Sequence, residues 1–305
     1  MTLGRLVVVG GPTGTGKSDL GLDLAERFDG EIVNADSMQL YRGMDIGTAK
    51  LPLEDRRGVP HHLLDVLDIS QRASVAAYQD RARTVIEEIL GRGRTPVLVG
   101  GSGLYVSAVI DRIEFPGTDP SVRADLEAEL AGVGAAALFG RLARLDPAAA
   151  ASIEPANGRR IVRALEVIAL TGRPFTATLP VPGPPLYDAV LLCLDRDTPT
   201  LDERLAVRVH EMVAAGFLDE VRVLERVGLR DGVTASRALG YPQMLSVLDG
   251  VAELDDAVTE TVRLTRRFVR RQRSWFGRDV RMQRLDAGAH DLTARAVELA
   301  LAAGP

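Results

Sequence analysis

Several features that would define a class of protein are missing from this chain of 305 residues. A single cysteine, Cys193, excludes an internal disulfide framework and a cysteine-based zinc site. No run of about 18 or more apolar residues occurs, so no membrane-spanning helix is predicted. The net charge of -5 shows no overall basic excess, although a local basic surface can still bind a polyanion. A core strand predicted close to the N-terminus leaves no room for a signal peptide, so we expect a cytoplasmic protein without membrane contact.

A glycine-rich loop follows the first apolar run of the chain, Leu6–Val9, and precedes helix-forming residues. This order of strand, glycine loop and helix is typical of a phosphate-binding loop, or P-loop. Backbone amides and the start of a helix attract an anion, and a lysine adds a full charge. The serine hydroxyl that follows can hold Mg²⁺. A plain glycine-rich turn is the alternative. We predict that the phosphate-binding residues are Gly11, Pro12, Thr13, Gly14, Thr15, Gly16, Lys17 and Ser18, with Ser18 also a metal ligand.

The nature of the phosphate compound is a separate question. Loops of this type usually bind nucleotides such as ATP. A P-loop hydrolase also places an aspartate after an apolar strand to hold magnesium. Here the apolar run Val97–Val99 leads into Gly100, Gly101 and Ser102 instead, and no arginine-finger or water-positioning glutamine motif is visible. The residues typical of hydrolysis are therefore missing or displaced.

The first third of the chain alternates between predicted strands and helices. This pattern predicts an α/β fold with a parallel sheet that is covered by helices on both faces. Ligands of such sheets lie beyond the carboxyl ends of the strands, where Asp36 and Ser102 also fall. The predicted strands are Arg5–Val9, Glu31–Asn34 and Pro96–Val99, and the predicted helices are Lys17–Phe28 and Ser74–Leu90.

A different pattern begins near Phe115. The sequence becomes rich in alanine, and no strand is predicted until Tyr187–Asp195. We therefore expect a P-loop α/β core of residues 1–114 and 184–305, with an inserted all-helical domain of residues 115–183. The segment Pro180–Pro185 is expected to be a rigid return linker. The helices predicted in the insertion are Asp119–Val133, Ala135–Leu145 and Arg159–Thr171.

Asp36 is the first candidate for chemistry outside the loop. A carboxylate at a strand end beside a phosphate loop can steer magnesium, accept a proton from a substrate or cap a helix. Gln39 carries an amide that suits a purine edge, although exposed amides are common. Arg237 is predicted in a loop, where it could clamp a diphosphate. His61 and His62 point to opposite sides of an extended segment, so we expect structural roles rather than a metal site.

Arginines cluster in two further segments. Arg159, Arg160 and Arg163 share one face of a predicted helix. A second group combines seven arginines with aromatic side chains, a pattern typical of RNA binding. The alternative is a solvated basic face with Phe268 and Trp275 in the core. The second group consists of Arg263, Arg266, Arg267, Arg270, Arg271, Arg273 and Arg278, with Phe268, Trp275 and Phe276.

Taken together, these motifs resemble the bacterial tRNA dimethylallyltransferases, also called tRNA isopentenyltransferases. The match keeps the family's order and covers nearly the whole chain. The matching segments are Gly11–Ser18, Asn34–Tyr41, Asp45–Lys50, Pro60–Leu63, Val99–Tyr105, Asn157–Glu166, Arg237–Tyr241 and Arg270–Trp275.

The resemblance implies a reaction and its partners. The enzyme would move a dimethylallyl group from dimethylallyl diphosphate to the N6 amine of the adenosine 3′ of the anticodon, position 37, in tRNAs that read codons beginning with U. It would use Mg²⁺, bind the anticodon stem-loop and act as a monomer. The loop Gly11–Ser18 would hold the diphosphate.

The resemblance also implies residue roles. Asp36, Ser102 and Arg237 would be catalytic: Asp36 would accept the amine proton, and Arg237 would neutralise the departing diphosphate. The residues expected to contact tRNA are Asp36, Ser37, Met38, Gln39, Ser102, Arg123, Arg159, Arg160 and Arg163.

Three other functions stay open at this point. Prenyl transfer to free adenine nucleotides would need neither the helical insertion nor the arginine segment. A small-molecule kinase would use the same loop, but the missing aspartate after Val97–Val99 speaks against it. A non-enzymatic RNA-binding module with a vestigial loop would bind tRNA without turnover.

Overall fold

The structure is a computed structural model that describes residues 1–175 and 183–302. The chain forms two compact units. The first consists of Met1–Ile110 and Pro185–Pro305, and the second of Asp111–Pro184. The first three residues of the expected linker Pro180–Pro185 lie outside the described residues.

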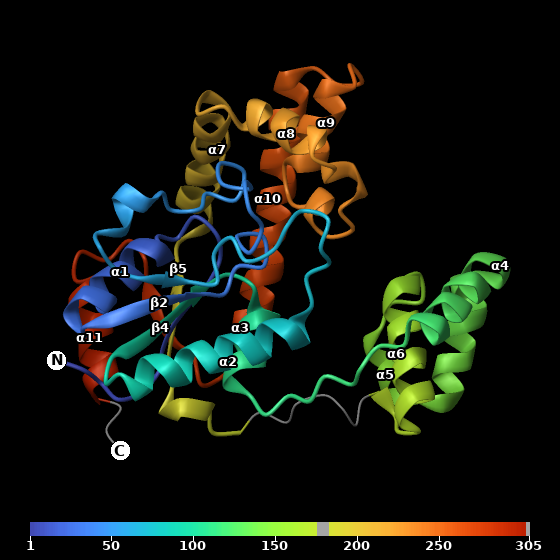
Figure 1. Cartoon of the computed structure of the whole chain (residues 1–305), viewed down its shortest axis with the longest axis horizontal. Coiled ribbons are helices and arrows are strands. Elements are labelled where there is room, and N and C mark those ends of the chain that lie inside the picture. The colour runs from blue at the N-terminus through green and yellow to red at the C-terminus, as the bar shows by residue number, and fades with distance from the viewer. Residues whose placement is uncertain (176–182, 303–305) are drawn as a thin grey trace. The chain divides into compact units, whose positions relative to one another are not determined.

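A six-stranded parallel sheet forms the centre of the first unit (Figure 1). Gly10 is the last residue of the strand Val7–Gly10. It pairs with Gly100 in the neighbouring strand on one side and with Cys193 in the neighbouring strand on the other. The loops after the central strands therefore leave the sheet at one edge, as in other parallel sheets. The α/β fold with a parallel sheet is confirmed. The spatial order is β3 (His61–His62), β2 (Gly30–Asn34), β4 (Thr95–Gly100), β1 (Val7–Gly10), β5 (Val190–Asp195) and β6 (Gln283–Asp286).

Helices cover both faces of the sheet because strand side chains alternate between the faces. Val8 and Leu98 pack with α2 (Val75–Gly91) and α3 (Gly103–Ile110) on one face. On the other face, Val7 packs with α1 (Lys17–Arg27) and α11 (Leu292–Ala302). Figure 1 shows these two helical layers on either side of the strands. The continuous apolar runs of the central strands follow from this double burial.

A second helical cluster in the first unit adjoins the carboxyl edge of the sheet. Its helices are α7 (Thr198–Ala214), α8 (Phe217–Arg226), α9 (Tyr241–Leu248) and α10 (Leu254–Phe276). The rings of Phe217 and Tyr241 meet edge to face with centroids 5.1 Å apart. At the other end of α10, the Phe276 ring lies so close to Gly10 that a Cβ there would be 2.7 Å from it. α10 thus links the helical cluster to the end of β1.

Within the described residues of the second unit, the regular secondary structure is helical. It contains α4 (Pro120–Leu145), α5 (Pro147–Ser152) and α6 (Gly158–Thr171). Gly134 interrupts α4 with φ 81° and ψ 165°, so the two helices expected on either side of it are the two halves of α4. The short helix α5 was not predicted. Asp146 explains where it begins, because its carboxylate accepts from the Ala149 amide at 2.9 Å.

No helix within the described part of the chain combines the length and the apolar character needed to cross a membrane.

Candidate active site

The loop between β1 and α1 depends on glycine conformations. Gly11, Gly14 and Gly16 have φ values of 134°, 83° and 85°. A Cβ on Gly11 would lie 2.2 Å from the carbonyl oxygen of Leu194 in the neighbouring strand β5. Glycine is therefore required there both for the backbone angle and for space. The predicted order of strand, glycine loop and helix is present, with α1 beginning at Lys17.

Side chains hold this loop from inside and from outside. Within the loop, Thr15 Oγ1 and Lys17 Nζ both donate to the carbonyl of Pro12, at 2.9 and 2.6 Å. From α10, the buried side chain of Gln272 accepts from the Thr13 amide at 3.0 Å. The same side chain donates to the carbonyl of Gly101 at 2.9 Å. Gln272 therefore ties the loops after β1 and β4 to one helix.

Two arginines of α7 contact the loop, and the sequence analysis did not predict either of them. Arg208 Nη1 donates to Thr13 Oγ1 at 3.0 Å, and Arg204 Nε donates to the carbonyl of Gly14 at 3.3 Å. Their spacing of four residues puts them on one face of a helix. That spacing was the available signal, but nothing local in the sequence connects α7 with the loop after β1.

The pKa values of the two cations reflect their surroundings. Burial, and after it the Arg208 charge, lower the pKa of Lys17 to about 8, against the opposing charges of Asp36 and Cys193. Burial also lowers the pKa of the Arg208 guanidinium. Crowded, partly desolvated cations are stabilised when an anion binds between them. The surroundings of these two cations would therefore favour an anion between the loop and α7.

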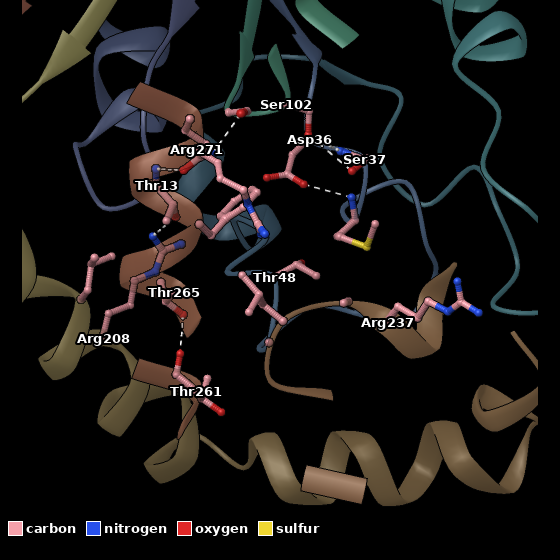
Figure 2. Close-up of a pocket in the computed structure, with 18 of the residues that line it drawn as sticks. Thr13, Asp36, Ser37, Thr48, Ser102, Arg208, Arg237, Thr261, Thr265 and Arg271 are labelled. Atoms are coloured by element: carbon pink, nitrogen blue, oxygen red, sulfur yellow. Dashed lines mark hydrogen bonds between the residues drawn. The ribbon is translucent and has the colours of Figure 1, made fainter. Parts of the chain in front are cut away.

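Asp36 follows β2 and lies in a tight turn with Ser37 and Met38. One carboxylate oxygen, Oδ1, accepts from the Met38 amide at 2.9 Å. Its other oxygen accepts no hydrogen bond from any residue that the structure describes. Ser102 Oγ, after β4, accepts from the Ser37 amide at 3.2 Å. Asp36 thus caps its own turn with one oxygen and keeps the other free of described hydrogen-bond partners. Figure 2 shows the Asp36 carboxylate and Ser102 on the same side of the pocket.

Two adjoining cavities, of about 450 and 610 Å³, meet at these residues. All residues that line them belong to the first unit. The smaller cavity is largely apolar, whereas the larger contains Lys17, Ser18 and Arg204. A group bound to the phosphate loop and a group held among apolar side chains would therefore meet near the shared wall. Both cavities are lined by Thr13, Asp36, Thr48, Gly101 and Arg208.

The remaining predicted residues of this unit lie at different parts of the cavities. Met38 lines the apolar cavity and Gln39 the polar one. The Gln39 amide is not free, because its Nε2 donates to the carbonyls of Thr48 and Ala49 at 3.1 and 3.4 Å. Arg237 lines only the apolar cavity. In Figure 2 its side chain is directed away from Thr13.

Ser18 lies exposed in the first turn of α1 and lines the polar cavity beside Lys17. Among the residues that the structure describes, no group of three or more His, Cys, Asp or Glu side chains could hold a metal ion. One hydroxyl beside a phosphate site nevertheless suits Mg²⁺, which keeps several waters and takes other ligands from substrate phosphates. The residues present therefore fit a magnesium ion that arrives with a diphosphate.

The predicted RNA-binding arginines of the helical unit fall into two pairs. Arg123 and Arg163 are bound to the buried carboxylate of Glu166, with N–O distances of 2.6 and 2.7 Å. Arg163 also donates to the carbonyls of Pro116 and Gly117. In contrast, the side chains of Arg159 and Arg160 are exposed and have no ion pair with any described residue. The structure thus leaves the second pair available to a polyanion.

The arginine-rich segment is α10 and the turn after it. Its aromatic side chains are not all in the core. Trp275 is 42% exposed, and it lines the apolar cavity together with Phe268 and Arg271. Only Phe276 is buried. The alternative with Phe268 and Trp275 in the core is therefore wrong. Arg271 lies over the Phe268 ring at 5.6 Å.

His61 and His62 form the short edge strand β3, and each has a structural partner. His61 Nδ1 lies 2.8 Å from the carbonyl of Val59, and His62 Nε2 lies 2.6 Å from the carboxylate of Glu31. Burial lowers the pKa of His61.

The family of the chain follows from a comparison of its sequence with family models. Residues 39–279 match the model described as IPP transferase. The chain belongs to the IPP transferase family. The predicted resemblance is therefore confirmed.

Named relatives of this IPP transferase agree over most of its length. It is 62% identical over 287 residues to the tRNA dimethylallyltransferase of Streptomyces griseus, an alignment that covers 94% of this chain and 92% of the relative. It is 60% identical over 300 residues to the tRNA dimethylallyltransferase of Salinispora arenicola, covering 98% and 87%.

Solved structures of the family are similar as well. The crystal structure of the tRNA isopentenylpyrophosphate transferase of Bacillus halodurans has a TM-score of 0.72 and 41% identity, covering 97% of this chain and 94% of the other. A eukaryotic dimethylallyltransferase, described in crystallographic snapshots of its action on tRNA, has a TM-score of 0.81 and 26% identity. That alignment covers 97% of this chain and 78% of the eukaryotic one.

Proposed function

We propose that this IPP transferase moves a dimethylallyl group from dimethylallyl diphosphate to the N6 amine of the adenosine 3′ of the tRNA anticodon, position 37, in tRNAs that read codons beginning with U. The observation that carries the proposal is that Thr13 of the phosphate loop, Asp36 and Arg208 line both the polar and the apolar cavity. The names of the relatives support tRNA as the substrate.

The loop Gly11–Ser18 would bind the diphosphate of the donor. The negative charge of the diphosphate would be surrounded by the loop amides, the start of α1, Lys17 and Arg208. As the bond between the allylic carbon and the diphosphate oxygen breaks, charge grows on the leaving diphosphate. Fixed cations then stabilise the transition state more than the ground state. A magnesium ion held at Ser18 and the diphosphate would supply further positive charge.

Asp36 would accept the proton of the amine. The adenine amine is a poor nucleophile because its lone pair is delocalised into the ring. Once the new bond between carbon and N6 forms, the amine becomes a strong acid, so an ordinary carboxylate suffices as the base. The free oxygen of Asp36 faces the shared cavity, and Ser102 holds the neighbouring turn. The proton passes from N6 to Asp36 and then to solvent, and diphosphate leaves.

The adenosine must leave its stack to reach the cavity, which costs a few kcal/mol. Contacts of RNA with Arg159 and Arg160 would offset this cost. We infer that the protein acts as a monomer, as the sequence resemblance implied. A tRNA substrate also supports the expected location in the cytoplasm. The competing reaction on free adenine nucleotides is less well supported, because the relatives are named for tRNA.

The test is an assay with unmodified tRNA, dimethylallyl diphosphate and Mg²⁺, followed by mass spectrometry of the nucleosides. We expect N6-dimethylallyladenosine from tRNA and little product from AMP, ADP or ATP. Asp36→Ala should reduce turnover about 100-fold, and Asp36→Asn should do the same without a change in side-chain size. Failure to modify any tRNA, with a folded protein and a range of metal concentrations, would contradict the proposal.

A further inference from the structure

The loop Asp45–Lys50 forms one wall of the two cavities. Thr48 lines both cavities, and Gly47 lines the apolar one. The loop is a compact turn, in which Ala49 N donates to the carbonyl of Ile46 and Lys50 N to that of Asp45, each at 2.9 Å. A turn of this kind leaves its first amides without partners inside the turn. Those amides need an acceptor from elsewhere in the fold.

Glu220 on α8 supplies that acceptor. Its Oε2 accepts from the amides of Asp45 and Ile46 at 2.9 and 2.6 Å. Its Oε1 accepts from the Gly47 amide at 3.2 Å and from the hydroxyl of Tyr241 at 2.7 Å. Burial raises the pKa of Tyr241, and the Glu220 charge adds to this, so the phenol stays protonated and can donate. One carboxylate thus receives four hydrogen bonds, and three of them come from consecutive amides of the loop.

A second anchor holds the other end of the loop. The buried ammonium of Lys50 contacts the carboxylates of Asp45 and Asp65 at 2.5 and 2.6 Å, and it donates to the carbonyl of Tyr41 at 2.9 Å. The middle of the loop packs closely against α8, since a Cβ on Gly47 would lie 2.2 Å from the Phe217 ring. The loop is therefore anchored at both ends and packed on one side.

The loop in turn decides how Gln39 faces the polar cavity. The two groups beside the Gln39 amide are the carbonyls of Thr48 and Ala49, which can only accept hydrogen bonds. The NH₂ of the amide must therefore face the loop, and Oε1 must face away from it. Oε1 accepts no hydrogen bond from any residue in the described part of the chain. Gln39 and Asp36 line the same polar cavity.

We propose that Glu220 is a positioning residue: by holding Asp45–Ala49 it fixes Gln39 as an acceptor for the amine of the target base. The inference rests on the proposed function and adds a specificity device to it. An exocyclic amine has two N–H bonds, and Asp36 and Gln39 offer one acceptor each. A purine without the amine leaves both acceptors without a donor, which costs binding free energy.

The test measures binding rather than turnover. Two anticodon stem-loop RNAs are compared, one with adenosine and one with unsubstituted purine riboside at the target position. For the intact protein we expect the adenosine RNA to bind about tenfold more tightly. In Glu220→Gln one carboxylate oxygen is replaced by an NH₂ group, which cannot accept hydrogen bonds from the loop amides or from the Tyr241 hydroxyl. The loop therefore loses part of its anchor. We expect the tenfold preference to fall below about twofold, while the affinity for dimethylallyl diphosphate stays within about twofold.

Asp219→Asn is the matched control. Asp219 precedes Glu220 on α8, is exposed, and pairs only with Arg222 among the described residues. The substitution removes the same charge from the same helix, and the preference for adenosine should persist. A Glu220→Gln protein that folds and keeps the full preference would overturn the inference.

Gln39→Leu covers the case in which Glu220→Gln does not fold, because it leaves the anchor of the loop intact. This variant should also lose the preference for adenosine, and a preserved preference would count against the inference. An intact protein that binds both RNAs equally would overturn it as well. An intact protein that shows the preference but never transfers a prenyl group would overturn the proposed function and leave this inference standing.

Discussion

Arg208 Nη1 donates to Thr13 Oγ1 at 3.0 Å, across 195 positions of sequence. This contact brings a cation from α7 against the loop that follows β1. Arg208 is also one of the residues that line both cavities, together with Asp36. The acid and the cations of the proposed reaction therefore meet through tertiary packing, and the predictions below depend on that meeting.

Removal of the Arg208 guanidinium should slow the chemical step. We expect Arg208→Ala to reduce kcat about 100-fold or more, because a fixed charge beside the leaving diphosphate is lost. Arg208→Lys should recover part of the rate, since the charge remains but the bond to Thr13 is weakened. Single-turnover rates of prenyl transfer would measure both effects.

A parallel variant, Arg237→Ala, tests the role that the sequence resemblance assigned to Arg237. Its side chain is exposed and directed away from Thr13 in Figure 2. We expect a smaller loss of kcat than in Arg208→Ala. An equal or larger loss would show that Arg237 reaches the diphosphate during the reaction.

Binding of the donor should weaken at alkaline pH. The pKa of Lys17 in the free protein is lowered to about 8 by burial first and by Arg208 second. Because a diphosphate binds the protonated ammonium, its affinity should be constant below about pH 7 and fall about tenfold per pH unit above pH 8. Calorimetric titration with dimethylallyl diphosphate across this range would measure the profile.

Lys17→Arg provides the control for this profile. An arginine keeps its proton throughout the range, so the alkaline loss of affinity should disappear even if the affinity itself is lower. The same alkaline loss in Lys17→Arg would assign the titration to another group.

The four arginines of the helical unit that were predicted to bind RNA should respond to mutation in two different ways. The exposed pair, Arg159 and Arg160, should contribute mainly to tRNA affinity. Arg159→Ala and Arg160→Ala should each weaken tRNA binding several-fold. Each should also reduce the slope of log affinity against log salt concentration by about one, because one fewer counterion is released. Filter binding at several salt concentrations would measure this.

Arg163→Ala should act mainly on stability, because it removes a partner of the buried Glu166 and the donor to the Pro116 and Gly117 carbonyls. We expect a loss of about 2 kcal/mol or more in the free energy of unfolding. A variant with unchanged stability but weaker tRNA binding would instead assign Arg163 to the RNA contact.

Acid should destabilise the protein through Glu166. Burial would raise its pKa, but hydrogen bonds from Arg123, Thr118 and Arg163 outweigh burial and lower the pKa from 4.5 to about 2. A depressed pKa contributes stability above pH 4.5, and this contribution is lost as the pH falls toward 2. The loss should be about 2–3 kcal/mol. Urea unfolding at pH 6 and pH 3 should show it in the intact protein and a smaller change in Glu166→Gln.

The sequence by itself determined the parts of the molecule that depend on local patterns. The glycines of Gly11–Ser18, the apolar run before them and the helix after them are neighbours in the chain, so their geometry is readable without a fold. The alternation of predicted strands with predicted helices in the first third of the chain predicted a parallel sheet covered by helices on both faces. Asp36 and Ser102 were predicted near the loop because parallel strands end at one edge.

Only the tertiary structure decided which distant side chains complete the site. Arg208, Gln272 and Glu220 lie on helices, and the loop residues that they hold are more than 170 residues away in the sequence. The same holds for the division of Arg123, Arg159, Arg160 and Arg163 into a buried pair and an exposed pair. Helical spacing puts arginines on one face, but only packing around Glu166 determines which of them already have a partner. Local sequence encodes backbone conformation, whereas the pairing of charges depends on which elements the folded core brings together.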